Sequence, residues 1–85
     1  MKQFEYTLTV KEGMHARPAG LFVKEAAKFK SNITITKGDK SVDAKRLFSV
    51  MGLGTRQGDT VTLSAEGEDE DTAINILNGF FKKNF

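Results

Sequence analysis

The fold is decided by residues 3–29, which read QFEYTLTVKEGMHARPAGLFVKEAAKF. The first eight of these residues alternate strictly between polar and apolar side chains. The apolar positions are Phe4, Tyr6, Leu8 and Val10. A period of two in aromatic and branched residues predicts a half-buried strand over residues 3–10. Glu12 and Gly13 then break the pattern.

Residues 16–29 change to the spacing of a helix. One helical face collects the residues Ala19, Phe22, Val23, Ala26 and Phe29. Pro18 lies just inside the start of this helix, where a missing N–H is not needed. Ser31 and Asn32 are expected to end it. The stretch therefore predicts a strand, a loop and an amphipathic helix.

The rest of the chain repeats the same two patterns. We expect strands over residues 33–36, 41–43 and 60–65 and a short helix over residues 44–52. Turn residues at 37–40 predict a hairpin between the first two of these strands. A last helix starts after Asp69, a candidate N-cap. Its predicted buried stripe is Ala73, Ile74, Leu77, Phe80 and Phe81.

The order of these elements is β-α-β-β-α-β-α. Amphipathic strands require one covered face and leave the other in contact with water. We therefore predict an α+β fold, an open-faced sandwich with a four-stranded, largely antiparallel sheet and three helices on one face. The chain has 85 residues, which is the size of one domain, so residues 1–85 are expected to form a single domain.

Composition narrows the class of protein. Hydrophobic residues make up 39% and charged residues 28%, as in a soluble globular domain. There is no cysteine, which favours a cytoplasmic protein without disulfides. No apolar run reaches the length of a membrane span, so no insertion into a membrane is expected. The net charge is +2, with acidic residues clustered over 66–71 and basic residues concentrated earlier.

The only histidine, His15, lies between the loop after the first strand and the start of the first helix. A lone histidine is more often structural than chemical, but the first turn of a helix has free amides and partial positive charge. Such a turn binds anions, including phosphoryl groups. The candidate donors are the amides of Ala16 and Arg17, and the Arg17 guanidinium fits phosphate oxygens. A neutral imidazole is also a competent nucleophile toward phosphorus.

The string Gly13-Met14-His15-Ala16-Arg17-Pro18 resembles the active-site motif of a known family. That family is the histidine-containing phosphocarriers, HPr, of the bacterial sugar phosphotransferase system. The resemblance runs along essentially the whole chain. It continues through Phe22-Val23-Lys24-Glu25-Ala26, Leu47-Phe48 with Leu53-Gly54, Gln57-Gly58-Asp59 and Ser64-Ala65-Glu66-Gly67-Glu68-Asp69-Glu70.

The resemblance implies a carrier rather than an enzyme with its own substrate. Enzyme I, charged by phosphoenolpyruvate, would phosphorylate His15 on Nδ1, and IIA domains of sugar permeases would then take the phosphoryl group. Arg17 would stabilise and orient that group. The resemblance also implies a monomer that needs no cofactor and no metal, and that does not bind nucleic acid.

In the family, the first two helices form the surface that docks onto Enzyme I and the IIA domains. The matching positions are Ala16, Gly20, Leu21, Leu47, Phe48 and Met51, with Arg17, Lys24, Lys45 and Arg46 around them. Helical geometry agrees in part, because Leu21 lies off the buried stripe. Leu47, Phe48, Val50 and Met51 also cannot share one narrow face, so at least one is expected to be exposed. The basic rim predicts acidic partners and salt-sensitive association.

One position departs from the family pattern. Many relatives carry a regulatory serine at the start of the second helix, where an ATP-dependent kinase adds phosphate, but the matching residue here is Arg46. Ser41 and Ser49 are nearby but out of register. We therefore expect the chain to lack this switch. Arg46 either strengthens docking to an acidic partner or is simply a solvated arginine at the start of a helix.

Three other functions compete with this interpretation. A related carrier of a nitrogen-type or fructose-type relay would use His15 and Arg17 in the same way. An RNA-binding module of similar topology would need stacking aromatics on its open sheet face, whereas Phe4 and Tyr6 alternate with the core. A hydrolase would need a catalytic triad or a set of metal ligands, and the sequence shows no such cluster.

Overall fold

The computed structural model describes all 85 residues. Its elements follow one another as β1 (Lys2–Thr7), α1 (Ala16–Ala27), β2 (Asn32–Lys37), β3 (Lys40–Asp43), α2 (Leu47–Gly52), β4 (Thr60–Glu66) and α3 (Glu70–Asn84). The predicted β-α-β-β-α-β-α order and the predicted hairpin are confirmed. None of the helices has the length and apolar character needed to cross a membrane.

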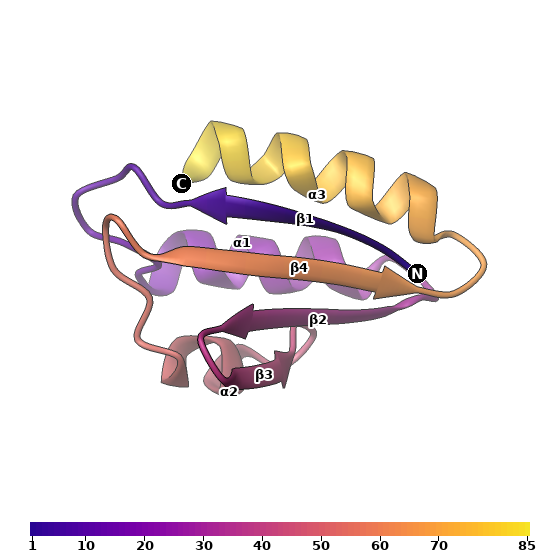
Figure 1. The fold of residues 1–85 in the computed structure, drawn as a ribbon, viewed down its shortest axis with the longest axis horizontal. Helices are drawn as coiled ribbons and strands as arrows, with labels where there is room; N and C mark the ends of the chain where they lie inside the picture. Colours follow the sequence, from indigo (N-terminus) through magenta and orange to yellow (C-terminus); the bar gives the residue numbers. More distant parts are fainter.

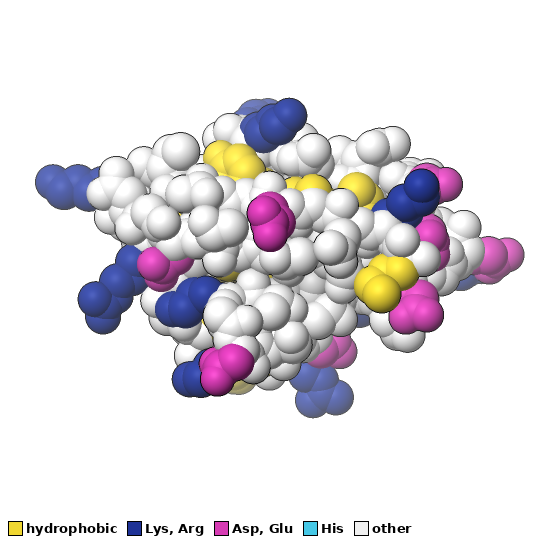
Figure 2. Space-filling view, viewed as in Figure 1, with side chains coloured by type: hydrophobic (Ala, Val, Ile, Leu, Met, Phe, Trp, Pro, Cys, Tyr) yellow, Lys and Arg dark blue, Asp and Glu magenta, His cyan; other side chains and the backbone are white.

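The four strands form one antiparallel sheet in the order β1-β4-β2-β3. β4 pairs with both β1 and β2, so a strand from late in the sequence lies between two strands from its first half. The helices cover one face of this sheet, as predicted, with α3 beside β1 and α2 beside β3 (Figure 1). The opposite face is uncovered and shows few hydrophobic side chains (Figure 2). It carries half-buried hydroxyls such as Thr34, Thr62 and Ser64.

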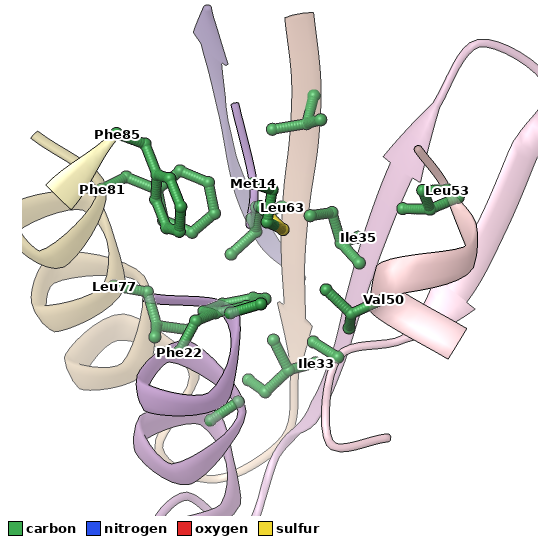
Figure 3. Packing of buried hydrophobic residues seen from close by; sticks show 14 of the residues in the cluster. Met14, Phe22, Ile33, Ile35, Val50, Leu53, Leu63, Leu77, Phe81 and Phe85 are labelled. Carbon is green, nitrogen blue, oxygen red and sulfur yellow. The ribbon is translucent and has the colours of Figure 1, made fainter. Parts of the chain in front are cut away.

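The core lies between the sheet and the helices (Figure 3). Alternate residues of β2 and β4 point into it, namely Ile33, Ile35, Val61, Leu63 and Ala65, and all are buried. The rings of Phe22 and Phe81 join α1 to α3, with centroids 5.1 Å apart and nearly perpendicular planes. Burying each such side chain contributes about 2–3 kcal/mol. Phe4 and Tyr6 of β1 also pack edge-on against Phe81.

The first strand is shorter than its sequence pattern predicts. β1 ends at Thr7, although the alternation continues to Val10. Leu8 remains buried and exchanges backbone hydrogen bonds with Gly58 and Asp59, but the amides of Thr9 and Val10 donate to the carbonyl of Phe85. The Phe85 carbonyl therefore accepts the two amides, of Thr9 and Val10, that lie in the predicted continuation of β1.

The boundaries of two helices also differ from prediction. α1 ends at Ala27 rather than near Phe29, because the amides of Lys28 and Phe29 make tighter bonds to carbonyls three residues back. α2 begins at Leu47 rather than Ala44. Asp43 holds the preceding turn, since its side chain accepts from the Lys45 amide at 2.9 Å and its carbonyl accepts from Arg46.

Asp69 is the N-cap residue of α3, as predicted, and its carbonyl accepts the Ala73 amide, but its side chain makes no capping hydrogen bond. Its carboxylate instead accepts the amides of Lys30 and Ser31, at 2.8 and 3.0 Å, and the Ser31 hydroxyl. Gly67 also packs closely against Ser31, since an added Cβ would lie 2.7 Å from the Ser31 hydroxyl oxygen. Asp69 thus ties α3 to the end of α1 and lies far along the sheet from His15.

Candidate functional site

His15 is the N-cap residue of α1, with an extended backbone (φ −86°, ψ 173°) and an exposed side chain. This is the position that the sequence predicts. Its carbonyl accepts the first helical hydrogen bond, from the amide of Ala19 at 3.0 Å. The amides of Ala16 and Arg17 have no acceptor within the chain, and Pro18 has no amide hydrogen. Two free donors therefore follow directly after the imidazole.

The loop in front of His15 is held by contacts to the segment that precedes β4. The amide of Met14 donates to the carbonyl of Thr55 at 3.1 Å, and the Met14 side chain is buried in the core (Figure 3). Gly13 has a φ of +65°, which a residue with a side chain rarely adopts. A Cβ at Gly13 would also lie 2.6 Å from the Thr55 carbonyl oxygen and 2.8 Å from the Arg56 Cα.

The imidazole has one partner within the chain. Nδ1 of His15 lies 3.3 Å from the carbonyl oxygen of Gly13, which also accepts the His15 amide at 3.1 Å. A carbonyl can only accept, so this contact favours the tautomer with the proton on Nδ1. Nδ1 can act as a nucleophile only when that proton is on Nε2 instead. Attack through Nδ1 therefore requires the ring to give up the Gly13 contact.

Arg17 lies in the first turn of α1 with its side chain exposed. The ion pairs of the molecule involve other residues, so no carboxylate neutralises the Arg17 guanidinium. The free cation adds to the partial positive charge of the helix start. His15, two free amides and one unpaired guanidinium thus lie within three consecutive residues.

The turn before β4 is fixed by Asp59. The Asp59 carboxylate accepts the amide of Arg56 at 2.9 Å and lies 3.6 Å from Nζ of Lys37. The hydrogen bond from the Arg56 amide, followed by the charge of Lys37, lowers the pKa of Asp59 below its usual range. Asp59 is therefore ionised at neutral pH, and it keeps the turn closed.

The predicted docking surface is partly exposed and partly built into the fold. Phe48 is 89% exposed, Leu21 48% and Leu47 38%, which confirms that the two helices leave apolar side chains uncovered. Met51 and Gly20 are half-buried, whereas Ala16, Lys24 and Arg46 are exposed. Lys45 is half-buried and donates to the carbonyl of Phe29 at 2.7 Å. Its ammonium group is therefore committed within the chain.

Sequence reasoning missed the contribution of residues 53–59. Thr55, Arg56 and Gln57 carry turn-like patterns and no chemical motif, so nothing in the sequence links them to His15. The structure brings these residues next to the loop that carries His15. Thr55 accepts the Met14 amide, and the Gln57 side chain donates to the carbonyl of Thr9 at 3.0 Å. The hydroxyl of Thr55 is buried without a hydrogen-bond partner. The only signal was Gly13, a glycine placed where two segments approach closely.

The geometry bears on the competing functions as well. The rings of Phe4 and Tyr6 pack against Phe81 on the helix side of the sheet, so they do not form a stacking platform on the open face. No three side chains of the metal-ligating types His, Cys, Asp and Glu lie close enough together to hold a metal ion. The site does offer one exposed imidazole, which can act as a nucleophile, beside hydrogen-bond donors that can bind an anion.

Comparison with known proteins identifies the relatives. A family model described as the PTS HPr component phosphorylation site matches residues 2–83. The phosphocarrier protein HPr of Buchnera aphidicola is 53% identical over 78 residues, covering 92% of each chain. A crystal structure of HPr from Thermoanaerobacter tengcongensis has a TM-score of 0.93 at 46% identity, covering 98% of this chain and 93% of that one. An HPr dimer from the same organism has a TM-score of 0.78, covering 98% and 95%.

Proposed function

The chain belongs to the HPr family of phosphotransferase-system phosphocarriers, and from that premise we propose that it carries a phosphoryl group on His15. The donor is phosphorylated Enzyme I, which takes its phosphoryl group from phosphoenolpyruvate. The acceptors are IIA domains of sugar permeases. In this proposal the exchange takes place in the cytoplasm, and the chain acts as a monomer although one relative crystallises as a dimer.

The observation that carries the proposal is the exposed imidazole at the start of α1. It is followed by two amides that have no acceptor and by an arginine that has no carboxylate partner. A phosphoryl group on His15 brings negative charge to the point where these donors converge. Charge-assisted hydrogen bonds of this kind contribute about 1.5–3 kcal/mol each.

Each of the two transfers, from the donor to His15 and from His15 to a IIA domain, is one displacement at phosphorus. The Nδ1 lone pair of His15 forms the new P–N bond while the P–N bond to the donor's phosphohistidine breaks, and the donor imidazole leaves with that electron pair. The His15 proton is on Nε2 during attack, so the Gly13 contact of Nδ1 is released first. Transfer to a IIA domain reverses these roles. The donors of α1 hold the group through few contacts, which keeps it transferable.

Docking is assigned to the exposed side chains of α1 and α2. Phe48, Leu47 and Leu21 supply the apolar contact, and Ala16, Gly20 and Met51 line the same surface. Arg17, Lys24 and Arg46 supply positive charge around it, whereas Lys45 acts mainly by joining the segment before α2 to Phe29, which follows α1. This arrangement supports partners with a small apolar patch inside an acidic rim. Binding should weaken as salt rises, because surface charges are screened.

Regulation by serine phosphorylation is not part of the proposal. Arg46 stands at the N-cap of α2, 3.7 Å from the Asp43 carboxylate, with its side chain 77% exposed. A positive charge here has the opposite sign to a phosphoserine. The surface therefore keeps its basic character, and the flow of phosphoryl groups is not reduced by a kinase acting at this position.

A two-step transfer assay tests the function. The chain is charged with Enzyme I and labelled phosphoenolpyruvate, Enzyme I is removed, and a purified IIA domain is added. We expect the label to move to the IIA domain within the mixing time of the assay. A chain that takes the label but never releases it to any sugar-type IIA domain would contradict the proposed role. Parallel transfer with a nitrogen-type Enzyme I distinguishes the related carrier class.

A further inference from the structure

The segment before β4 packs tightly against the loop that carries His15. Four hydrogen bonds join the two loops. The amides of Leu8 and Met14 donate to the carbonyls of Asp59 and Thr55 at 3.0 and 3.1 Å. In the other direction, Gly58 donates to the Leu8 carbonyl at 2.9 Å and the Gln57 side chain to the Thr9 carbonyl at 3.0 Å. The two loops therefore form one unit, and Arg56 is part of it.

Arg56 lies close to His15 within this unit. Its Cα is 2.8 Å from the position of a Cβ at Gly13, and the Gly13 carbonyl oxygen is 3.3 Å from Nδ1 of His15. With standard bond lengths, these contacts keep the Arg56 Cα within about 10 Å of Nδ1. An arginine side chain extends about 6 Å beyond its Cα. The Arg56 guanidinium can therefore approach a group attached to the imidazole.

The Arg56 guanidinium is also free to do so. The side chain is exposed and makes no ion pair. The Asp59 carboxylate accepts the Arg56 amide and pairs with Lys37, and the charge of the Arg56 guanidinium contributes only the smallest part of the lowering of the Asp59 pKa. The remaining charged residues of the two loops are Lys11 and Glu12, and α1 adds Arg17. Positive charge exceeds negative charge in this set, so the end of the molecule around His15 attracts anions.

We propose that Arg56 is a second cation of the phosphoryl site, which stabilises the phosphoryl group on His15 together with Arg17 and the helix amides. Arg17 is supplied by the helix that starts after His15, whereas Arg56 is supplied by the loop before β4, whose backbone approaches Gly13 closely. This inference rests on the proposed function, because it concerns the group that His15 carries.

The test is a pH titration of the phosphorylated chain, monitored by 31P NMR. Arg56→Gln removes the charge and keeps a long polar side chain, Arg56→Lys keeps the charge, and Lys40→Gln is a matched control. Lys40 is exposed at the β2–β3 turn and makes no ion pair. Each variant is charged with Enzyme I and phosphoenolpyruvate. The readouts are the pH midpoint at which the phosphoryl group gains a proton and the half-life of the P–N bond.

A nearby cation favours the more negative form of the phosphoryl group. We expect Arg56→Gln to raise its protonation midpoint by about 0.3 pH units, a twofold change in proton affinity, at low salt. The shift should shrink in 0.5 M salt, and Arg56→Lys should restore most of it. The half-life of the P–N bond should also change in Arg56→Gln and be restored by lysine. Lys40→Gln should leave both readouts at their wild-type values.

Two outcomes would overturn the inference in different ways. Equal midpoints in wild type, Arg56→Gln and Lys40→Gln, or equal shifts in both variants, would show that Arg56 has no special place at the site, while the carrier function stands. If wild type gives no phosphohistidine signal at all, the proposed function fails, and the role of Arg56 fails with it.

Discussion

The backbone amide of Met14 donates to the carbonyl of Thr55 at 3.1 Å, which joins two loops that are distant in the sequence. The Met14 side chain is buried at the same time, so the residue before His15 is fixed by its main chain and its side chain. His15 itself is exposed. A rigid support under a free imidazole keeps the nucleophile accessible while its neighbours stay in place.

Gly13 should tolerate no side chain. Gly13→Ala combines a positive φ with a clash, because the added Cβ would lie only 2.6 Å from the Thr55 carbonyl oxygen. We expect a loss of about 3 kcal/mol in the free energy of unfolding, measured with urea. Phosphorylation of His15 by Enzyme I should slow at least about tenfold, because a 1 Å displacement near reacting groups is costly.

Gly79→Ala is the matched control for this substitution. Gly79 lies within α3, and nothing occupies the space of its missing Cβ. Alanine favours a helix interior over glycine by about 1 kcal/mol, so this variant should be more stable than wild type. Equal stability changes in the two variants would show that the close approach at Gly13 does not matter.

Phe48 should contribute to docking and not to folding. It is 89% exposed, so Phe48→Ala should change the free energy of unfolding by less than about 0.5 kcal/mol. Truncation of an aromatic anchor typically costs about 1–2 kcal/mol of binding, which corresponds to about a tenfold rise in KM for the Enzyme I reaction. Because docking precedes chemistry, kcat should be little changed.

Ile76→Ala provides the comparison for Phe48. Ile76 is also exposed, at 46%, but lies on α3 outside the first two helices. It should alter neither stability nor KM to a comparable extent. A KM for Phe48→Ala that equals the wild-type value would remove Phe48 from the docking surface.

Asp69 should make stability depend on acid. The hydrogen bond from the Ser31 hydroxyl, followed by that from the Lys30 amide, lowers the pKa of Asp69 below its ordinary value of 3.8. The folded chain therefore binds this proton less readily than the unfolded chain. The stabilisation is fully present above about pH 5 and is lost as pH falls below 4 through the lowered pKa.

Urea unfolding of Asp69→Asn between pH 6 and pH 2.5 checks this account. The variant should be less stable than wild type at pH 6, and the two should converge as pH falls. Asp59 and Glu70, whose pKa values are also lowered, remain in both proteins and leave a residual slope. Curves that stay parallel throughout would show that Asp69 is not the group responsible.

Arg46 should make the chain a poor substrate for the serine kinase of related carriers. Incubation with that kinase and ATP should leave wild type without phosphoserine, because Arg46 occupies the N-cap position of α2. Arg46→Ser should accept phosphate at this exposed position. Stoichiometric phosphoserine at Ser49 in wild type would contradict the account, since it would show that the neighbouring serine replaces the missing one.

Local patterns were enough to predict the order of the elements and the place of His15. The alternation in β1 and β4 and the helical spacing in α1 and α3 are local patterns. They depend only on residues close in sequence, so they can be identified from the sequence alone. The place of His15 at or next to the start of α1 follows from Pro18, which lies just inside the helix, in the same way. The exposure of Leu21 was also predictable, because it lies off the buried stripe of α1, whereas for α2 the pattern predicted only that at least one large apolar residue is exposed.

Contacts between distant segments were not predictable. The amides of Thr9 and Val10 donate to the carbonyl of Phe85 instead of extending β1, and the Asp69 side chain turns from its helix toward Ser31. Each outcome depends on a competing acceptor or donor placed by the whole fold. The same holds for Arg56, whose loop is brought to the loop of His15 by backbone hydrogen bonds and by the close packing at Gly13.

The central claim is that His15 carries the phosphoryl group. The most direct test mixes the chain with Enzyme I and labelled phosphoenolpyruvate and compares wild type with His15→Ala. The account predicts label on wild type that is labile in acid and stable in base, and no label on the variant. Acid-labile, base-stable label that persists in His15→Ala would contradict it.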